Sequence, residues 1–260
     1  MKKTILRIFA VVATAALTAG ALATTARIVR RTDSERKYRP FFEEKIDYDV
    51  LFFGTSHVIN AIFPMQLWHD YGITAYNFGG HANYIPMSYW SMRNAILYHK
   101  PKIAVLDIHY IIHNAKIYDA YMHTSFDSFP ITVTKIKGLC DLADNTNLFK
   151  ILKNFLFPYE TYHNRWKEFT FERSWNELLF RIPRAEKGAE SRIAVAIPNK
   201  NPQTDLPLEH ETVGMEYIRH FVAFCRTNGI TPILINIPFP ATEEEQRGAN
   251  SAQLLATELD

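Results

Sequence analysis

Short apolar runs alternate with amphipathic segments from residue 49 onward. Three runs end at turn-forming or charged residues and are too short for globular helices, which predicts buried strands at residues 50–53, 73–78 and 103–108. Between them, helical spacing predicts one helix that begins at Pro64 and ends at Gly72, and a second over residues 85–99 that stops before Pro101. This alternation predicts a parallel sheet with right-handed crossovers and helices on both faces.

The alternation is interrupted between residues 111 and 200, where an aromatic-rich stretch without clear strands predicts a mostly helical insertion. Regular structure returns with an amphipathic helix at residues 211–228 and a strand at residues 232–237. Thr242 and Glu245 then form a capping-box pattern that opens a last helix. The strand–helix alternation leads us to expect a three-layer α/β/α sandwich with a parallel, flavodoxin-like sheet. Because no strand is predicted after this helix, we expect the last strand of the sheet to be missing.

The amino terminus has a different character. Lys2, Lys3 and Arg7 precede 19 uncharged residues, 8–26, a length that can span a bilayer. Residues 1–31 therefore predict a signal anchor, or a secretory peptide cut after Ala23, and both interpretations export the remainder of the chain. The expected location is the cell membrane, with one span and an extracytoplasmic domain over residues 49–260. The charged residues 32–48 between them predict a solvated tether.

Composition narrows the class of protein. The chain is 47% hydrophobic and 22% charged, as globular domains are, and its net charge of +2 provides no basic field for nucleic acid. Two cysteines are too few for a disulfide framework. Cys225 falls on the apolar stripe of its helix, which predicts a buried free thiol.

Polar residues follow the predicted strands. Because the carboxyl ends of parallel strands share one edge, we expect them to meet there. A serine on a strand-to-helix turn can act as a nucleophile, and a glycine turn lets backbone N–H groups approach an oxyanion. The alternative for such a serine is a helix N-cap. The candidates are Ser56 and His57 after the first strand, Asn77, Gly79 and Gly80 after the second, and Asp107 and His109 after the third.

Two of these segments, Gly54-Thr55-Ser56 and Asn77-Phe78-Gly79-Gly80, resemble the first two sequence blocks of the SGNH (GDSL-like) esterases and acyltransferases. The closer resemblance is to exported members that O-acylate cell-surface polymers, including alginate O-acetylation proteins and the D-alanine transfer protein of teichoic acids. Residues 162–166 also resemble a stretch of exported members. The resemblance implies an SGNH fold in which Ser56 takes the acyl group and the Ser56 and Gly79 amides stabilise the oxyanion.

The resemblance further implies a cell-surface glycan or acylated polymer as substrate, a membrane-bound acyltransferase as partner, and no metal or other cofactor. Two family features are missing. The asparagine of the third block is absent from residues 105–109, and no Asp-x-x-His pair follows the last predicted strand. We therefore expect a carboxyl-terminally truncated chain that is inactive as it stands.

Several alternatives stay open at this stage. His109 or His113, oriented by Asp107, could replace the missing base, whereas His57 is expected to point away from its neighbour Ser56. The spacing of His109, His113 and His123 matches no tight metal-ligand pattern. The alternative function is a non-catalytic envelope protein of the same fold that binds a glycan or a membrane acyltransferase.

Overall fold

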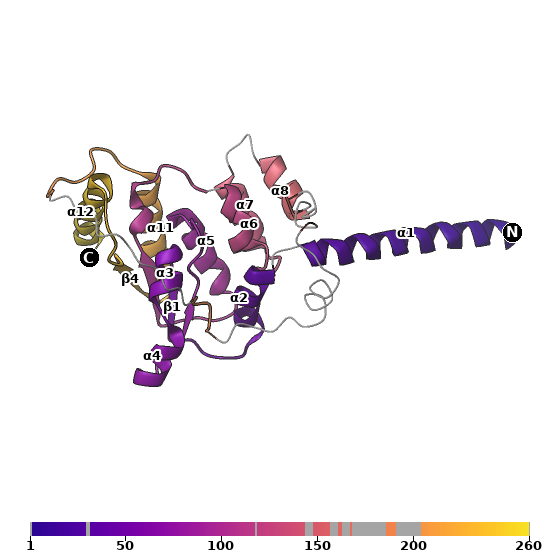
Figure 1. Ribbon diagram of the computed structural model, residues 1–260, viewed down its shortest axis with the longest axis horizontal. Helices are drawn as coiled ribbons and strands as arrows, with labels where there is room; N and C mark the ends of the chain where they lie inside the picture. Colours follow the sequence, from indigo (N-terminus) through magenta and orange to yellow (C-terminus); the bar gives the residue numbers. More distant parts are fainter. Residues whose placement is uncertain are drawn as a thin grey trace. The chain divides into compact units, whose positions relative to one another are not determined.

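The computed structural model describes residues 2–29, 32–117, 119–143, 148–156, 161–162, 167, 186–190 and 204–259 (Figure 1). The chain forms two units, residues 1–32 with 149–182 and residues 33–148 with 183–260. The candidate residues all belong to the second unit.

In the first unit, helix α1 (Lys2–Val29) contains an apolar stretch, Lys3–Thr25, of 23 residues with mean hydropathy 2.0. None of it is buried against the protein. The helix is long and apolar enough to cross a membrane, and a signal sequence has the same properties.

The second unit is built on a parallel sheet in the order β2-β1-β3-β4. Val50 pairs with Ala75 on one side and with Ile103 on the other, and Ile103 pairs with Thr231. This order matches the first four strands of flavodoxin-like sheets and confirms the predicted α/β class. The strands are β1 (Val50–Phe53), β2 (Ala75–Asn77), β3 (Ile103–Asp107) and β4 (Thr231–Ile235).

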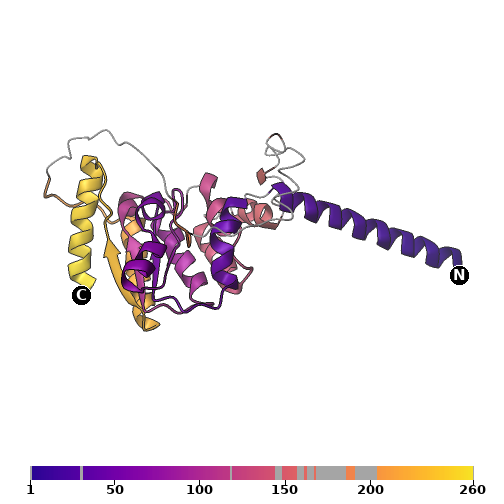
Figure 2. The ribbon, with the colours of Figure 1, turned by 60° about the horizontal axis from the view of Figure 1, so that its bottom comes forward.

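The helices begin and end close to their sequence signals. Helix α4 starts at Pro64 and is closed by Gly72, whose φ of 68° is in the left-handed region. The Thr242 N–H donates to Glu245 Oε2 at 2.7 Å, which confirms the capping box, and Figure 2 shows the resulting helix α12 at the β4 end of the sheet. From Phe149 onward, helix α8 (Leu148–Leu156) belongs to the first unit. The described helices of the sheet-bearing unit are α2 (Thr32–Glu43), α3 (Ser56–Ala61), α4 (Pro64–Tyr71), α5 (Ile85–Ala95), the 3-10 turn η1 (His109–Ile112), α6 (Asp119–Phe126), α7 (Val133–Leu142), α11 (Val213–Thr227) and α12 (Glu243–Leu259).

Several elements are shorter than predicted, among them the third strand, which ends at Asp107, and the helix expected over residues 211–228, which runs from Val213 to Thr227. The second strand begins at Ala75, the helix expected over residues 85–99 ends at Ala95, and the last strand ends at Ile235. Within residues 111–200, the described elements are helical, as expected; the predictions that concern residues 163–166 and 168–185 lie outside the described residues.

The segment expected to be a solvated tether is instead a helix that belongs to the core. Phe41 of α2 is fully buried, and its ring lies 4.6 Å from Phe78 and 5.1 Å from Tyr76. Arg39 and Glu43 form an exposed ion pair on the other side of the helix, whereas Lys37 is buried with the aromatic residues. The high charge content concealed a helical stripe of aromatic residues, because composition does not record which face each residue occupies.

Candidate functional site

The turn between β1 and α3 presents Ser56 at the carboxyl edge of the sheet. Gly54 has a φ of 151°, and a Cβ there would lie 2.6 Å from the Cβ of Asp107, so the turn requires glycine. Thr55 is the N-cap of α3, since its hydroxyl oxygen accepts the His57 N–H at 3.1 Å. Ser56 is therefore the first residue of the helix, and the capping role considered for it falls to Thr55.

The side chain of Ser56 has no structural role in the described part of the chain. Ser56 is partly exposed, and within the described residues no hydrogen bond to its hydroxyl is found. Because the Thr55 side chain caps the start of α3, the Ser56 hydroxyl is not needed as a helix cap.

The Asn77 side chain forms hydrogen bonds to α3. Its side chain is fully buried, and its Nδ2 donates to the carbonyl oxygens of Val58 at 2.7 Å and Ile62 at 2.8 Å. Its Oδ1 accepts the Gly79 N–H at 2.9 Å. Asn77 is thus a positioning residue that joins the helix carrying Ser56 to the glycine turn.

The glycine turn is fastened by its own backbone groups. The Gly80 N–H donates to the Gly54 carbonyl at 2.9 Å, and the Gly79 carbonyl accepts from Lys37 Nζ at 2.5 Å and from the Tyr38 hydroxyl at 2.9 Å. A Cβ at Gly79 would lie 2.8 Å from the backbone of α3, so the close approach requires glycine. The Gly79 and Gly80 N–H groups both donate hydrogen bonds within the turn. One of these bonds would have to break before its N–H group could donate to an oxyanion.

Asp107 joins the ends of the two central strands. It is 1% exposed and accepts from the Thr55 hydroxyl at 3.2 Å and from the His109 backbone N–H at 3.3 Å. Burial raises the pKa of its carboxyl group, while the nearby His57 opposes the shift. Within the described residues, no histidine ring bonds this carboxylate, so Asp107 orients backbone and the capping threonine rather than an imidazole.

Two histidines lie together at the same edge. The rings of His57 and His109 have centroids 4.1 Å apart, and Phe239, from the segment after β4, lies 5.1 Å from the first and 4.2 Å from the second. The sequence predicts that His57 points away from Ser56, and the structure shows its ring packed against His109 and Phe239. Both Nδ1 atoms are buried and have no hydrogen-bond partner in the structure.

The electrostatic state of His109 follows from this burial. Loss of hydration, followed by repulsion from His57, lowers the pKa of His109 to about 4. The ring is therefore neutral at neutral pH and carries a nitrogen lone pair that can accept a proton.

The other histidines considered from the sequence have separate surroundings. His113 stacks on Tyr84 with ring centroids 4.6 Å apart, and His123 pairs with Asp127 at 2.9 Å. Across the described residues, no group of three or more His, Cys, Asp or Glu side chains could hold a metal ion.

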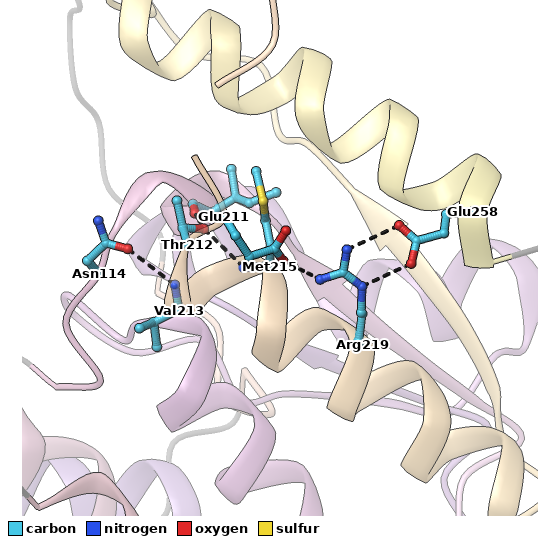
Figure 3. A network of polar contacts seen from close by, with 8 residues as sticks. Asn114, Glu211, Thr212, Val213, Met215, Arg219 and Glu258 are labelled. Carbon is cyan, nitrogen blue, oxygen red and sulfur yellow. Dashed lines mark hydrogen bonds and ion pairs between the residues drawn. The ribbon is translucent and has the colours of Figure 1, made fainter. Parts of the chain in front are cut away.

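The segment that carries His109 is held by α11 (Figure 3). The Thr212 hydroxyl donates to the Ile111 carbonyl at 2.5 Å, and its oxygen accepts the Met215 N–H as the N-cap of α11. The Val213 N–H donates to Asn114 Oδ1 at 3.3 Å. Arg219, one turn further along α11, pairs with Glu211 and with Glu258 of α12. The bonds to Ile111 and Asn114 attach the η1 segment to the start of α11, and the Arg219 ion pair with Glu258 joins α11 to α12.

The structure places the candidates that follow β1, β2 and β3 at one edge of the sheet, whereas His113 and His123 have other surroundings. Thr55 and Phe239 also lie at this edge. Burial would raise the pKa of the Glu245 carboxyl group, but hydrogen bonds from Thr242 and the nearby His109 and His57 lower it. Phe239 follows the fourth predicted strand, so the sequence already places it at this edge. Topology places the ends of all parallel strands at one edge.

Comparison with models of protein families, with curated proteins and with solved structures finds no match. The fold defines the chain as an α/β protein with a four-stranded parallel sheet.

Proposed function

We propose that this protein is an exported serine esterase or O-acyltransferase of the SGNH kind that acts on a cell-envelope polysaccharide. The observation that carries the proposal is the placement of Ser56. It is the first residue of α3 at the end of a central strand, its hydroxyl has no hydrogen bond within the described residues, and the next residue, His57, packs its ring against His109.

This placement suits acyl transfer. The Ser56 oxygen attacks an ester carbonyl, and the acyl group passes to the serine while the alcohol leaves. Water then completes a hydrolysis, or a sugar hydroxyl completes a transfer. The resemblance of Gly54-Thr55-Ser56 to the first SGNH block supports the same role. Helix α1 suits a membrane anchor that holds the domain on the extracytoplasmic side, where a glycan and a membrane acyltransferase would be its partners.

The test is covalent labelling of the full-length chain in detergent micelles by a fluorophosphonate, with the modified peptide identified by mass spectrometry. We expect a single modification at Ser56, absent from Ser56→Ala and retained by the control Asn60→Ala, which truncates a side chain of the same helix. Equal labelling of wild type and Ser56→Ala would refute the nucleophile.

A second candidate is a non-catalytic envelope protein that binds an acylated glycan. The bonding of Asp107 favours it, because this carboxylate contacts Thr55 and backbone rather than a histidine ring. It predicts that an O-acetylated polysaccharide binds wild type and Ser56→Ala equally in calorimetry, and that neither chain reacts with the fluorophosphonate.

A further inference from the structure

We propose that His109 is the general base that takes the proton from Ser56. The inference rests on the proposed function, to which it adds the proton acceptor that the SGNH resemblance leaves without a residue in this sequence.

The first support is geometric. Ser56 and His57 are consecutive residues at the start of α3, and the His109 ring lies against His57 with a centroid separation of 4.1 Å. Phe239 packs edge-on against His109, with ring centroids 4.2 Å apart. This places a neutral imidazole next to the turn that carries the serine.

The second support is that both groups lack other commitments. The Nδ1 of His109 is buried without a partner, and within the described residues the Ser56 hydroxyl has no hydrogen bond. A buried polar atom without a partner costs free energy, and active sites are places where that cost is tolerated. The bond between the two must form when an ester binds, as catalytic hydrogen bonds often tighten only in the complex.

The third support is the set of charges around the ring. His109 faces His57 from α3, while Tyr110 and His113 follow it in its own segment and Glu245 lies at the start of α12. Asp107, two residues before it, holds its backbone N–H. Burial would raise the pKa of the Glu245 carboxyl group, but hydrogen bonds from Thr242 and the nearby histidines keep that pKa below its usual range. Glu245 is therefore a carboxylate that can balance the imidazolium formed in the reaction.

The step is balanced within these groups and the substrate. The Ser56 O–H bond breaks, its proton goes to the free ring nitrogen of His109, and the oxygen electron pair forms a bond to the ester carbonyl carbon. The carbonyl π pair moves to its oxygen. When that oxygen re-forms the carbonyl, the bond to the alcohol oxygen breaks and the alcohol leaves with the proton from His109. Water or a sugar hydroxyl then releases the acyl group by the same steps.

The test is the rate of fluorophosphonate labelling of Ser56 in the full-length chain, for wild type, His109→Gln and His113→Gln. General-base assistance contributes about 10²–10⁴-fold, so His109→Gln should lower the rate by at least about 100-fold. His113→Gln, whose ring stacks on Tyr84 in the same segment, is the matched control and should leave the rate within about twofold. Added imidazole should restore part of the rate of His109→Ala.

The pH profile gives an independent readout. His109 accepts a proton only when neutral, and its pKa is about 4. The wild-type rate should therefore stay level between about pH 8 and pH 5 and fall below that, whereas a histidine of ordinary pKa would lose rate from about pH 6.5.

The outcomes separate the two proposals. If wild type labels at Ser56 and His109→Gln labels equally fast, the base assignment is wrong and the serine remains. If His109→Gln is slow but imidazole does not restore His109→Ala, the role of His109 is structural and the assignment is also wrong. If wild type does not label at Ser56, the proposed function falls and the base with it.

Discussion

Replacing Asn77 by alanine tests how the structure positions Ser56. The side chain makes three hydrogen bonds from a fully buried position: two to carbonyl oxygens of Val58 and Ile62, and one from the Gly79 N–H. Val58 would keep a partner after the change, because its carbonyl also accepts the Ile62 N–H at 3.1 Å. The Ile62 carbonyl and the Gly79 N–H would lose the partner that Asn77 supplies.

The magnitude follows from these contacts. Each hydrogen bond contributes about 1 kcal/mol net, and a buried group left without a partner costs about 1–3 kcal/mol. We expect Asn77→Ala to lower the free energy of unfolding by about 3–5 kcal/mol, a large share of the stability of a domain. Since α3 loses its attachment to the glycine turn, labelling of Ser56 should also slow in the fraction that remains folded.

The assay is urea unfolding in detergent micelles, followed by tryptophan fluorescence and compared with Asn60→Ala. Asn60 lies on the same helix, and its Oδ1 is buried without a hydrogen-bond partner, so its truncation should change the free energy of unfolding by less than about 0.5 kcal/mol. Equal losses for the two variants would show that the Asn77 contacts do not hold α3.

Two further predictions concern other parts of the unit. Phe41→Ala should lower the free energy of unfolding by about 3–5 kcal/mol, because the ring is fully buried among aromatic residues; a loss below about 1 kcal/mol would support the tether interpretation of residues 32–48. Asp49→Asn concerns pH. Hydrogen bonds from Lys102, then from Thr74, lower the pKa of Asp49 to about 2. A lowered pKa stabilises the fold above the unfolded value, so the advantage of wild type should be complete at pH 7 and disappear as pH falls from about 4 to 2 in thermal unfolding. An advantage that persisted at pH 2 would contradict the assignment.

Much of the fold was predictable because its signals are local. The run Val50–Phe53, the closing Gly72 and the capping box of Thr242 and Glu245 each act through residues within one or two turns of the chain. Such signals depend on backbone conformation and neighbouring hydrogen bonds, which the residue types themselves restrict.

The candidate site was predictable only in outline. Parallel topology requires Ser56, Gly79 and Asp107 to meet at one edge, and they do. The bonds among them depend on side-chain direction and on which donor reaches an acceptor first. Sequence spacing does not contain that information, so the capping role of Thr55 and the packing of His57 against His109 were not predicted.

By itself, the sequence determined the parallel α/β sheet, the apolar amino-terminal helix and the delivery of Ser56 to a strand end. Only the tertiary structure decided that α2 belongs to the core, that Asn77 bonds to α3, and that the rings of His57 and His109 pack together with buried Nδ1 atoms. The physical reason is the distance along the chain over which each kind of interaction acts. Local signals act between neighbours along the chain, whereas burial and hydrogen-bond pairing depend on segments that become neighbours only when the sheet forms.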